Sequence, residues 1–191
     1  ATVANNQTSS DFQLWCDYIY LDTDERRRFA QVSHEYLIEQ VQHDSKTNGG
    51  SMELNFNHPV KELIWSGIRD TTIDVNSNVL YDRTPVGAET YKLTLNGHDR
   101  IKAMNYKYFT RTQVWQHHSG YGCTETDGDT IAVYSFALKP EEHQPSGTCN
   151  FSRIDNAELV DTATTADINI YAINYNVLRI MSGMGGLAYS N

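Results

Sequence analysis

Apolar and polar residues alternate along several short stretches of this chain, as they do in half-buried β-strands. The segments 52–57 (MELNFN) and 91–95 (YKLTL) carry an apolar residue at every second position. Because successive strand side chains point to opposite faces, each segment predicts a strand with one buried face. The segments 12–21 (FQLWCDYIYL) and 35–41 (EYLIEQV) are also predicted to be strands.

Two later segments have apolar patterns that differ from that of a half-buried strand. Residues 131–138 (IAVYSFAL) are apolar on both faces, which predicts a strand covered twice, by the domain's own core and by a second domain or another subunit. In 167–181 (DINIYAINYNVLRIM) the parity of the apolar positions switches, which predicts a β-bulge. After a break at 183–186 (GMGG), residues 187–189 (LAY) are predicted to form a last edge strand.

Helix signals are scarce. Residues 22–32 (DTDERRRFAQV) open with acidic residues spaced as in a capping box, and arginines follow them, as the helix dipole prefers. Residues 60–65 (VKELIW) fit a helix or a strand, and 100–117 predict a short helix within a long loop. Turn signals lie at 48–50 (NGG), 96–97 (NG) and 127–128 (DG). About seven or eight short strands separated by turns predict an all-β sandwich or barrel.

The amino-acid composition excludes several functional classes of protein. The 191 residues carry 15 Lys and Arg against 24 Asp and Glu, a net charge of −9, which argues against a nucleic-acid surface because such surfaces are rich in Lys and Arg. No apolar run approaches the roughly 20 residues of a membrane span. Residues 1–11 are mostly small and polar and are predicted to be a flexible linker, with one domain at 12–191. Since the chain starts at Ala1, we expect a processed chain or a piece of a longer one.

No candidate site supports enzymatic chemistry, a metal or a cofactor. The pair His117-His118, with His98 upstream, is interpreted as surface or interface histidines, because neighbours on a strand point to opposite faces. The acidic stretch 124–129 lacks the ligand spacing of an EF-hand loop. Cys149 with His143 is the nearest approach to a nucleophile and base, but sequence proximity is not geometry. The chain contains no G-x-S-x-G, H-E-x-x-H or P-loop motif.

The remaining polar features have structural interpretations. Cys16, Cys123 and Cys149 form no C-x-x-C pair and are predicted to be free thiols. Two N-x-S/T sequons make Asn6 and Asn150 candidate glycosylation sites, of which Asn150, at the start of a predicted strand, is expected to be structural. The acids Asp22, Asp24 and Glu25 are explained by the helix start. The basic run Arg26–Arg28 is interpreted as a salt-bridged helix face, with a subunit contact as the alternative.

Residues 134–156 (YSFALKPEEHQPSGTCNFSRIDN) resemble the signature segment of the major capsid proteins of nucleocytoplasmic large DNA viruses, especially those of algal viruses. The resemblance covers nearly all of residues 12–191. Its further matches are 18–31 (YIYLDTDERRRFAQ), 34–40 (HEYLIEQ), 58–65 (HPVKELIW), 95–100 (LNGHDR) and 176–189 (NVLRIMSGMGGLAY).

This resemblance implies an all-β fold, an eight-stranded antiparallel jelly-roll sandwich that is the second half of a double jelly roll, with one or two short helices in loops. The second apolar face of 131–138 would then pack against the missing half or a neighbouring subunit. The family signature loop would comprise Pro140, Gln144, Pro145, Ser146, Gly147, Cys149, Asn150 and Arg153. Its prolines and glycine would fix the loop shape, and Gln144, Ser146 and Asn150 would satisfy backbone groups.

The resemblance also implies a structural virion protein, with neither catalysis nor cofactors. Three copies would form a pseudo-hexagonal capsomer of an icosahedral shell, assembled in the host cytoplasm. The expected partners are further copies, neighbouring capsomers, minor capsid proteins and a missing N-terminal jelly roll. The chain would lie near an internal membrane but not in it, and would not contact nucleic acid directly. The alternative is a jelly-roll carbohydrate-binding module, because 12 Tyr and 3 Trp would suit sugar stacking.

Overall fold

The computed structural model of the chain describes residues 14–46, 50–67, 90–120, 122, 129, 131–161 and 168–189. No helix in these ranges is long and apolar enough to cross a membrane. The helical elements are α1 (Thr23–Gln31), α2 (Gln113–His117), a π-helical turn η2 (Tyr108–Thr112) and a 3-10 turn η3 (Phe151–Arg153). The strands are β1 (His34–Lys46), β2 (Ser51–Glu53), β3 (Pro59–Gly67), β4 (Thr90–Leu95), β5 (His98–Asn105), β6 (Ile131–Ser135), β7 (Cys149–Asn150), β8 (Ala157–Asp161), β9 (Ile168–Met181) and β10 (Met184–Leu187).

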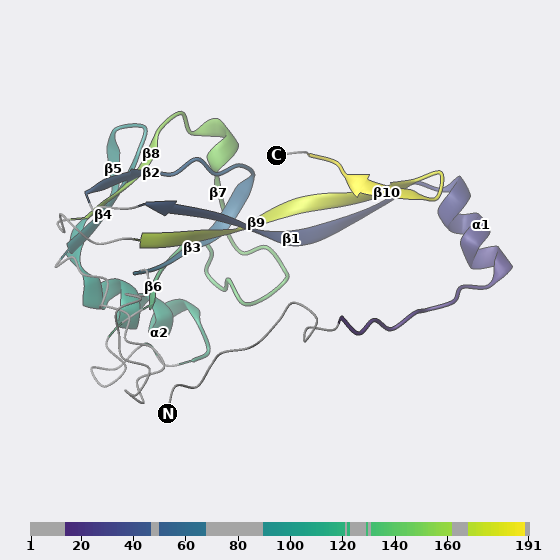
Figure 1. Cartoon of the computed structure of the whole chain (residues 1–191), viewed down its shortest axis with the longest axis horizontal. Helices are drawn as coiled ribbons and strands as arrows, with labels where there is room; N and C mark the ends of the chain where they lie inside the picture. The colour runs from purple at the N-terminus through teal and green to yellow at the C-terminus, as the bar shows by residue number, and fades with distance from the viewer. Residues whose placement is uncertain are drawn as a thin grey trace, which may run out of the picture.

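Two antiparallel sheets form a sandwich (Figure 1). One sheet follows the order β1-β9-β3-β6 and the other the order β2-β8-β4-β5, so the chain passes repeatedly from one sheet to the other. This is the arrangement of a jelly roll. The predicted antiparallel sandwich is therefore confirmed. Among the described residues the two paths contain eight strands, and β7 and β10 add short pairings to the first sheet.

The core between the sheets is aromatic at its centre. Trp65 of β3 lies 5.4 Å from Tyr91 of β4 and 5.2 Å from Phe109 of η2, measured between ring centroids, and all three are fully buried. Burial of each such side chain contributes roughly 1.5–3 kcal/mol. The inward faces predicted for 52–57 and 91–95 are confirmed, since Met52, Leu54, Phe56, Tyr91 and Leu93 are buried.

Both faces of β6 are covered by this chain itself. Tyr134 belongs to the core between the sheets, and Val133, on the opposite face, is also buried. Segments η2 and α2 pack on β6, and the Ser135 amide donates a hydrogen bond to Gln113 Oε1 at 3.2 Å. The expectation that a second domain or subunit covers this strand is therefore wrong over its buried part. The pattern of apolar residues predicts that a face of a strand is buried, but it does not identify the segment that covers that face.

The predicted bulge lies in a different strand. Strand β9 pairs with β1 without a register shift, whereas β3 shifts its register against β9 between Val60 and Glu62, which leaves Lys61 as the additional residue. The apolar parity of β9 switches because its buried face continues with the polar residues Asn174 and Asn176. Their side chains hydrogen-bond to glutamines of β1, so no bulge is needed to bury them.

The pairing of β9 with β3 ends at Asn174, and residues 178–181 of β9 pair with β10 instead. Strands β1, β9 and β10 form an arm that leaves the sandwich (Figure 1). The turn into β10 has positive φ at Ser182 (54°) and Gly183 (76°), as a two-residue hairpin requires. The predicted break at 183–186 is therefore largely strand, and the edge strand begins earlier than expected.

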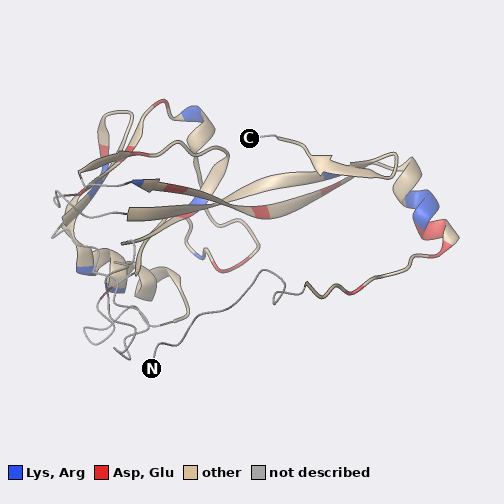
Figure 2. Cartoon of the chain, viewed as in Figure 1, with Lys and Arg blue, Asp and Glu red and all other residues tan. Residues whose placement is uncertain are grey.

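At the other end of the chain, α1 begins as predicted. The Asp22 side chain accepts a hydrogen bond from the Glu25 amide at 2.9 Å and caps the helix. No residue of α1 is buried, and its charged residues line the helix far from the sandwich (Figure 2). Residues 14–21, by contrast, form no strand, so that prediction is wrong for this chain. Residues 1–13, with the predicted linker, lie outside the described ranges.

Two further local predictions can be compared with the structure. Residues 60–65, which fitted a helix or a strand, belong to β3. Of residues 100–117, predicted to be a long loop with a short helix, 100–105 belong to β5 instead, while the helical part is confirmed by η2 and α2. The turn at 96–97 is confirmed, with φ of 50° at Asn96 and 76° at Gly97 between β4 and β5. The turn at 127–128, and most of that at 48–50, lie outside the described residues.

Candidate functional site

The segment 136–148, which joins β6 to β7 and contains most of the signature loop, is held against β3. The amides of Phe136 and Ala137 both donate to the Lys61 carbonyl, at 2.9 and 3.2 Å. Lys61 is the additional residue of the β3 register shift, and its carbonyl binds this segment. The irregularity in β3 thus provides the anchor of the segment.

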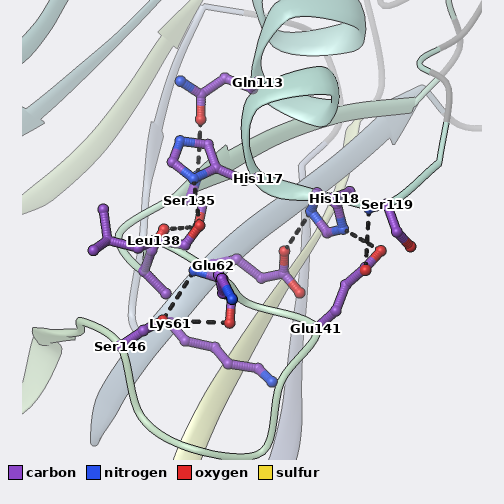
Figure 3. Close-up of polar contacts among 12 residues, drawn as sticks. Lys61, Glu62, Gln113, His117, His118, Ser119, Ser135, Leu138, Glu141 and Ser146 are labelled. Carbon is purple, nitrogen blue, oxygen red and sulfur yellow. Dashed lines mark hydrogen bonds and ion pairs between the residues drawn. The ribbon is translucent and has the colours of Figure 1, made fainter.

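The two ends of the segment are closed on each other by Ser146. The Lys139 amide donates to Ser146 Oγ at 2.9 Å, so the prediction that Ser146 satisfies a backbone group is confirmed (Figure 3). Gly147 has a φ of 148°, and a Cβ placed there would lie 2.7 Å from the Phe136 carbonyl oxygen. Pro140 is buried, whereas Gln144 and Pro145 are exposed. The Gln144 side chain makes no hydrogen bond with the described residues, so the expected role of Gln144 is wrong.

At the end of the segment, the sequon at Asn150 is built into the fold. Asn150 Oδ1 accepts from the Ser152 amide at 3.1 Å and caps η3, while Ser152 Oγ accepts from the His58 amide at 2.8 Å. Both polar side chains of the sequon therefore bind backbone groups, as expected of a structural position. Arg153, the last signature residue, is exposed in η3, and the other candidate glycosylation site, Asn6, lies outside the described residues.

Cys149 and His143 do not form a catalytic pair. Burial raises the pKa of the Cys149 thiol, an effect that the Arg100 charge opposes. A thiol with a raised pKa is a poor nucleophile near neutral pH. His143 Nδ1 lies 3.6 Å from Glu39 Oε1 instead. Cys16 and Cys149 are free thiols, and Cys123 lies outside the described ranges.

His118 joins three segments in one ionic cluster (Figure 3). Its Nε2 lies 3.0 Å from Glu62 Oε2 on β3, and its Nδ1 lies 3.2 Å from Glu141 Oε1 on the segment 136–148. The Ser119 amide donates to the second oxygen of Glu141 at 3.1 Å. His117 turns elsewhere, with Nδ1 3.1 Å from the Leu138 carbonyl oxygen.

The histidine prediction is thus half right. His117 and His118 lie at the C-terminal end of α2 and not on a strand, so the geometric reason given for separating them was wrong. They still contact different groups and do not converge on one ion. His118 is largely buried, with a side chain 17% exposed, and is therefore a link inside the fold more than a surface residue. His98, at the start of β5, is exposed and distant in sequence from both.

Different causes act on the two carboxyl groups of this cluster. Desolvation raises the pKa of Glu62, although the charges of His118 and Lys61 oppose the rise. Hydrogen bonds from Ser119 lower the pKa of Glu141. Lys61, 3% exposed, places Nζ 2.8 Å from Glu39 Oε1. The buried Lys61 ammonium is therefore paired with a carboxylate, which is the condition for retaining a buried charge at modest cost.

Nothing in this cluster is arranged to hold a metal. Across the described ranges, no three His, Cys, Asp or Glu side chains converge on a common ion position. Of the acidic stretch 124–129, only Asp129 is described, and its carboxylate is buried against Arg111 at 2.5 Å and Thr110 at 3.0 Å. The Arg111 guanidinium lowers the pKa of Asp129.

The charges of α1 behave as a solvated helix face. Asp24 pairs with Arg27 at 3.3 Å, and both side chains are largely exposed. This agrees with the salt-bridged interpretation of Arg26–Arg28, while a subunit contact there is untested. Sequence reasoning missed Lys61 and Glu62 as buried charges. The one available signal was two charged residues inside the otherwise apolar 60–65.

Comparisons with known proteins agree on one family. A family model described as "Large eukaryotic DNA virus major capsid protein" matches residues 25–186. The chain is 54% identical to the major capsid protein of Pyramimonas orientalis virus, over 93% of this chain and 48% of that protein. It is 41% identical to the major capsid protein of Paramecium bursaria Chlorella virus 1, over 93% of this chain and 54% of that protein. The chain thus spans about half the length of these relatives.

The fold agrees as well. A chain in a quasi-atomic model of the PBCV-1 virus capsid superposes with a TM-score of 0.72 at 38% identity, covering 91% of this chain and 56% of that one. Sequence and structure therefore point in the same direction, and they favour the capsid interpretation over a carbohydrate-binding module.

Proposed function

The chain belongs to the family of large eukaryotic DNA virus major capsid proteins, and from this premise we propose that it is a structural part of a virus shell. The family match over residues 25–186 carries the proposal, and the superposition on a capsid protein at a TM-score of 0.72 supports it. In this proposal residues 12–191 are the C-terminal jelly roll of a longer protein, and the chain does no chemistry.

Three copies of the complete protein form a pseudo-hexagonal capsomer, and capsomers tile an icosahedral shell. One edge of the described sandwich suits a contact between subunits. On it, Trp115 of α2 is 75% exposed and Leu138 is 72% exposed, and the two are linked through the bond from His117 to the Leu138 carbonyl. Exposed aromatic and aliphatic side chains of this kind are typical anchors of protein interfaces.

The further partners are neighbouring capsomers, minor capsid proteins and the N-terminal jelly roll of the same protein. The shell lies above an internal membrane that separates it from the genome, which is compatible with the net charge of −9. The signature loop, anchored on Lys61 and closed by Ser146, serves as a rigid structural element. The protein is a virion component assembled in the host cytoplasm.

The test is the native mass of the complete gene product, with negative-stain images. A stable trimer with a near-hexagonal outline is expected, and a monodisperse monomer would refute the capsomer proposal. A sharper version compares Trp115→Glu with Gln116→Glu, because both residues are exposed neighbours on α2 and receive the same charge. Trp115→Glu should dissociate the trimer into subunits that keep the circular dichroism spectrum of the wild type, and Gln116→Glu should leave the trimer intact.

A further inference from the structure

Both ring nitrogens of His118 face a carboxyl group. Nδ1 lies 3.2 Å from Glu141 Oε1, and Nε2 lies 3.0 Å from Glu62 Oε2 (Figure 3). His118 Nε2 and Glu62 Oε2 are buried from solvent, and neither atom has a hydrogen-bond partner elsewhere in the described part of the chain. These two atoms therefore depend on each other.

This arrangement fixes the number of protons that the three side chains hold. An ionised carboxylate only accepts hydrogen bonds, and a neutral imidazole has one N–H donor and one acceptor nitrogen. With both carboxyl groups ionised and the imidazole neutral, one nitrogen lone pair would face a carboxylate oxygen with no proton between them. Both contacts are favourable together only when the three side chains hold one further proton, on the imidazole or on a carboxyl group.

We propose that Glu62, His118 and Glu141 form a proton-dependent clasp, which holds the segment 136–148 in place and opens as the pH rises. Each side chain comes from a different element, since Glu62 lies in β3, His118 is the C-cap residue of α2, and Glu141 lies on the segment 136–148. The proton of the clasp therefore joins the segment to two elements of the sandwich at once.

Burial decides which of the two contacts opens. The side chain of Glu62 is 5% exposed and that of Glu141 is 45% exposed. Desolvation raises the pKa of Glu62, whereas hydrogen bonds from Ser119 lower the pKa of Glu141. A buried carboxylate needs a donor more than one that water can solvate. When the proton leaves, the remaining N–H therefore resides on His118 Nε2, toward Glu62, and Glu141 moves into solvent with the adjacent part of its segment.

The other charged groups around the clasp have partners of their own. The ion pairs are Lys61 with Glu39 at 2.8 Å, His143 with Glu39 at 3.6 Å, and Lys139 with Glu142 at 2.9 Å. His117 contacts the Leu138 carbonyl oxygen instead of a carboxylate. Lys61 acts on Glu62 through its charge, which opposes the effect of burial.

The clasp bears on the surface proposed above for contacts between subunits. The segment 136–148 carries Leu138, and α2 carries Trp115, which are the two exposed apolar residues of that surface. Opening of the clasp would therefore move Leu138 relative to Trp115. This consequence alone rests on the proposed function, since the clasp itself is a property of the single chain.

Amide hydrogen exchange followed by NMR tests the clasp. The Ser119 amide donates to Glu141 Oε2 at 3.1 Å, so its protection reports whether Glu141 is in place. The Ser135 amide, which donates to Gln113 Oε1, is the internal reference. After correction for intrinsic exchange rates, the protection of Ser119 relative to Ser135 should fall at least about 10-fold between pH 5 and pH 9. A constant ratio over this range would overturn the inference.

A variant that does not lose the proton separates the clasp from other effects of pH. Glu62→Gln supplies an amide N–H to His118 Nε2 at every pH, so the Ser119 ratio should stay at its acidic value throughout. Glu142→Gln is the matched control, because Glu142 is the neighbour of Glu141 and pairs with Lys139 instead of His118. It should keep the response of the wild type. A wild-type response in Glu62→Gln, or a lost response in Glu142→Gln, would overturn the inference.

If Glu62→Gln fails to fold, Glu141→Gln gives the same test, because its amide nitrogen can donate to His118 Nδ1 while its oxygen accepts from Ser119. Exchange and assembly are separate readouts. A constant Ser119 ratio in a trimeric protein refutes only the clasp, and a pH-dependent ratio in a monomeric protein refutes only the capsomer.

Discussion

Replacing Gly147 by alanine tests whether the segment 136–148 is a rigid part of this capsid protein. Gly147 has a φ of 148°, a conformation that L side chains rarely adopt. A Cβ there would lie 2.7 Å from the Phe136 carbonyl oxygen and 3.2 Å from the Ala137 Cα. These are backbone atoms, and the amides of both residues are fixed on the Lys61 carbonyl, so they cannot move aside cheaply.

The expected loss of stability follows from these contacts. A residue with a side chain held in this backbone conformation costs about 1–3 kcal/mol. The backbone clash adds to this cost, and together the two effects should destabilise the fold by roughly 2–4 kcal/mol. In a protein of this size each kcal/mol lowers the melting temperature by about 2–4 °C. We therefore expect Gly147→Ala to melt roughly 5–15 °C below wild type.

The assay is thermal unfolding followed by circular dichroism, with urea unfolding as a second measure of stability. Gly120→Ala is the matched control, because its φ is not in the left-handed range and a Cβ there would meet nothing within 4 Å. It should melt within about 1 °C of wild type. Pro145→Ala should lose at most about 1 kcal/mol, because Pro145 is exposed and only loop stiffness is removed. A Gly147→Ala protein as stable as the control would refute the rigid-loop interpretation.

Three further predictions concern charges and a cap. Asp129→Asn should lower the free energy of unfolding by about 1.5–3 kcal/mol at pH 7. Because Arg111 lowers the pKa of Asp129, the difference between variant and wild type should shrink as the pH falls through that lowered pKa, and urea unfolding at pH 7 and pH 3 would measure it. Burial raises the pKa of Glu62, so the wild type loses stability from this group as the pH rises. The stability of Glu62→Gln relative to wild type should therefore increase from pH 4 to pH 8. The opposite trend in urea unfolding would contradict the conclusion that burial determines the pKa of Glu62. Asp22→Ala should weaken α1 by about 0.5–2 kcal/mol; since α1 buries no residue, its amides should exchange roughly 2- to 30-fold faster while the melting temperature stays constant.

The features that sequence predicted well are those decided within a few residues. The Asp22 cap, the turn at Asn96-Gly97 and the buried faces of 52–57 and 91–95 depend on local hydrogen bonds, on backbone conformation and on side-chain alternation. Each of these can be recognised in a short window, because the groups involved are neighbours along the chain. The signature segment added the fold family, which the structure and the comparisons confirm.

The candidate site was harder to predict from the sequence, because its contacts join residues that are distant along the chain. Glu62 and His118 lie 56 positions apart and meet only because α2 packs on β6, which pairs with β3. The anchor on Lys61 exists because β3 shifts its register at that residue, which no local pattern indicated. Gln144 stands in the same loop as Ser146, yet only Ser146 is oriented toward the backbone.

By itself, then, the sequence determined the buried faces of segments 52–57 and 91–95, the positions of one helix and several strands, and the family to which the chain belongs. Only the tertiary structure decided what covers each residue. In the tertiary structure α2 and η2 cover β6, the bulge lies in β3 instead of β9, and residues 14–21 pair with no strand of the described residues. The physical reason is that alternation records the burial of a side chain, whereas the identity of its neighbour depends on how the whole chain is threaded through the two sheets.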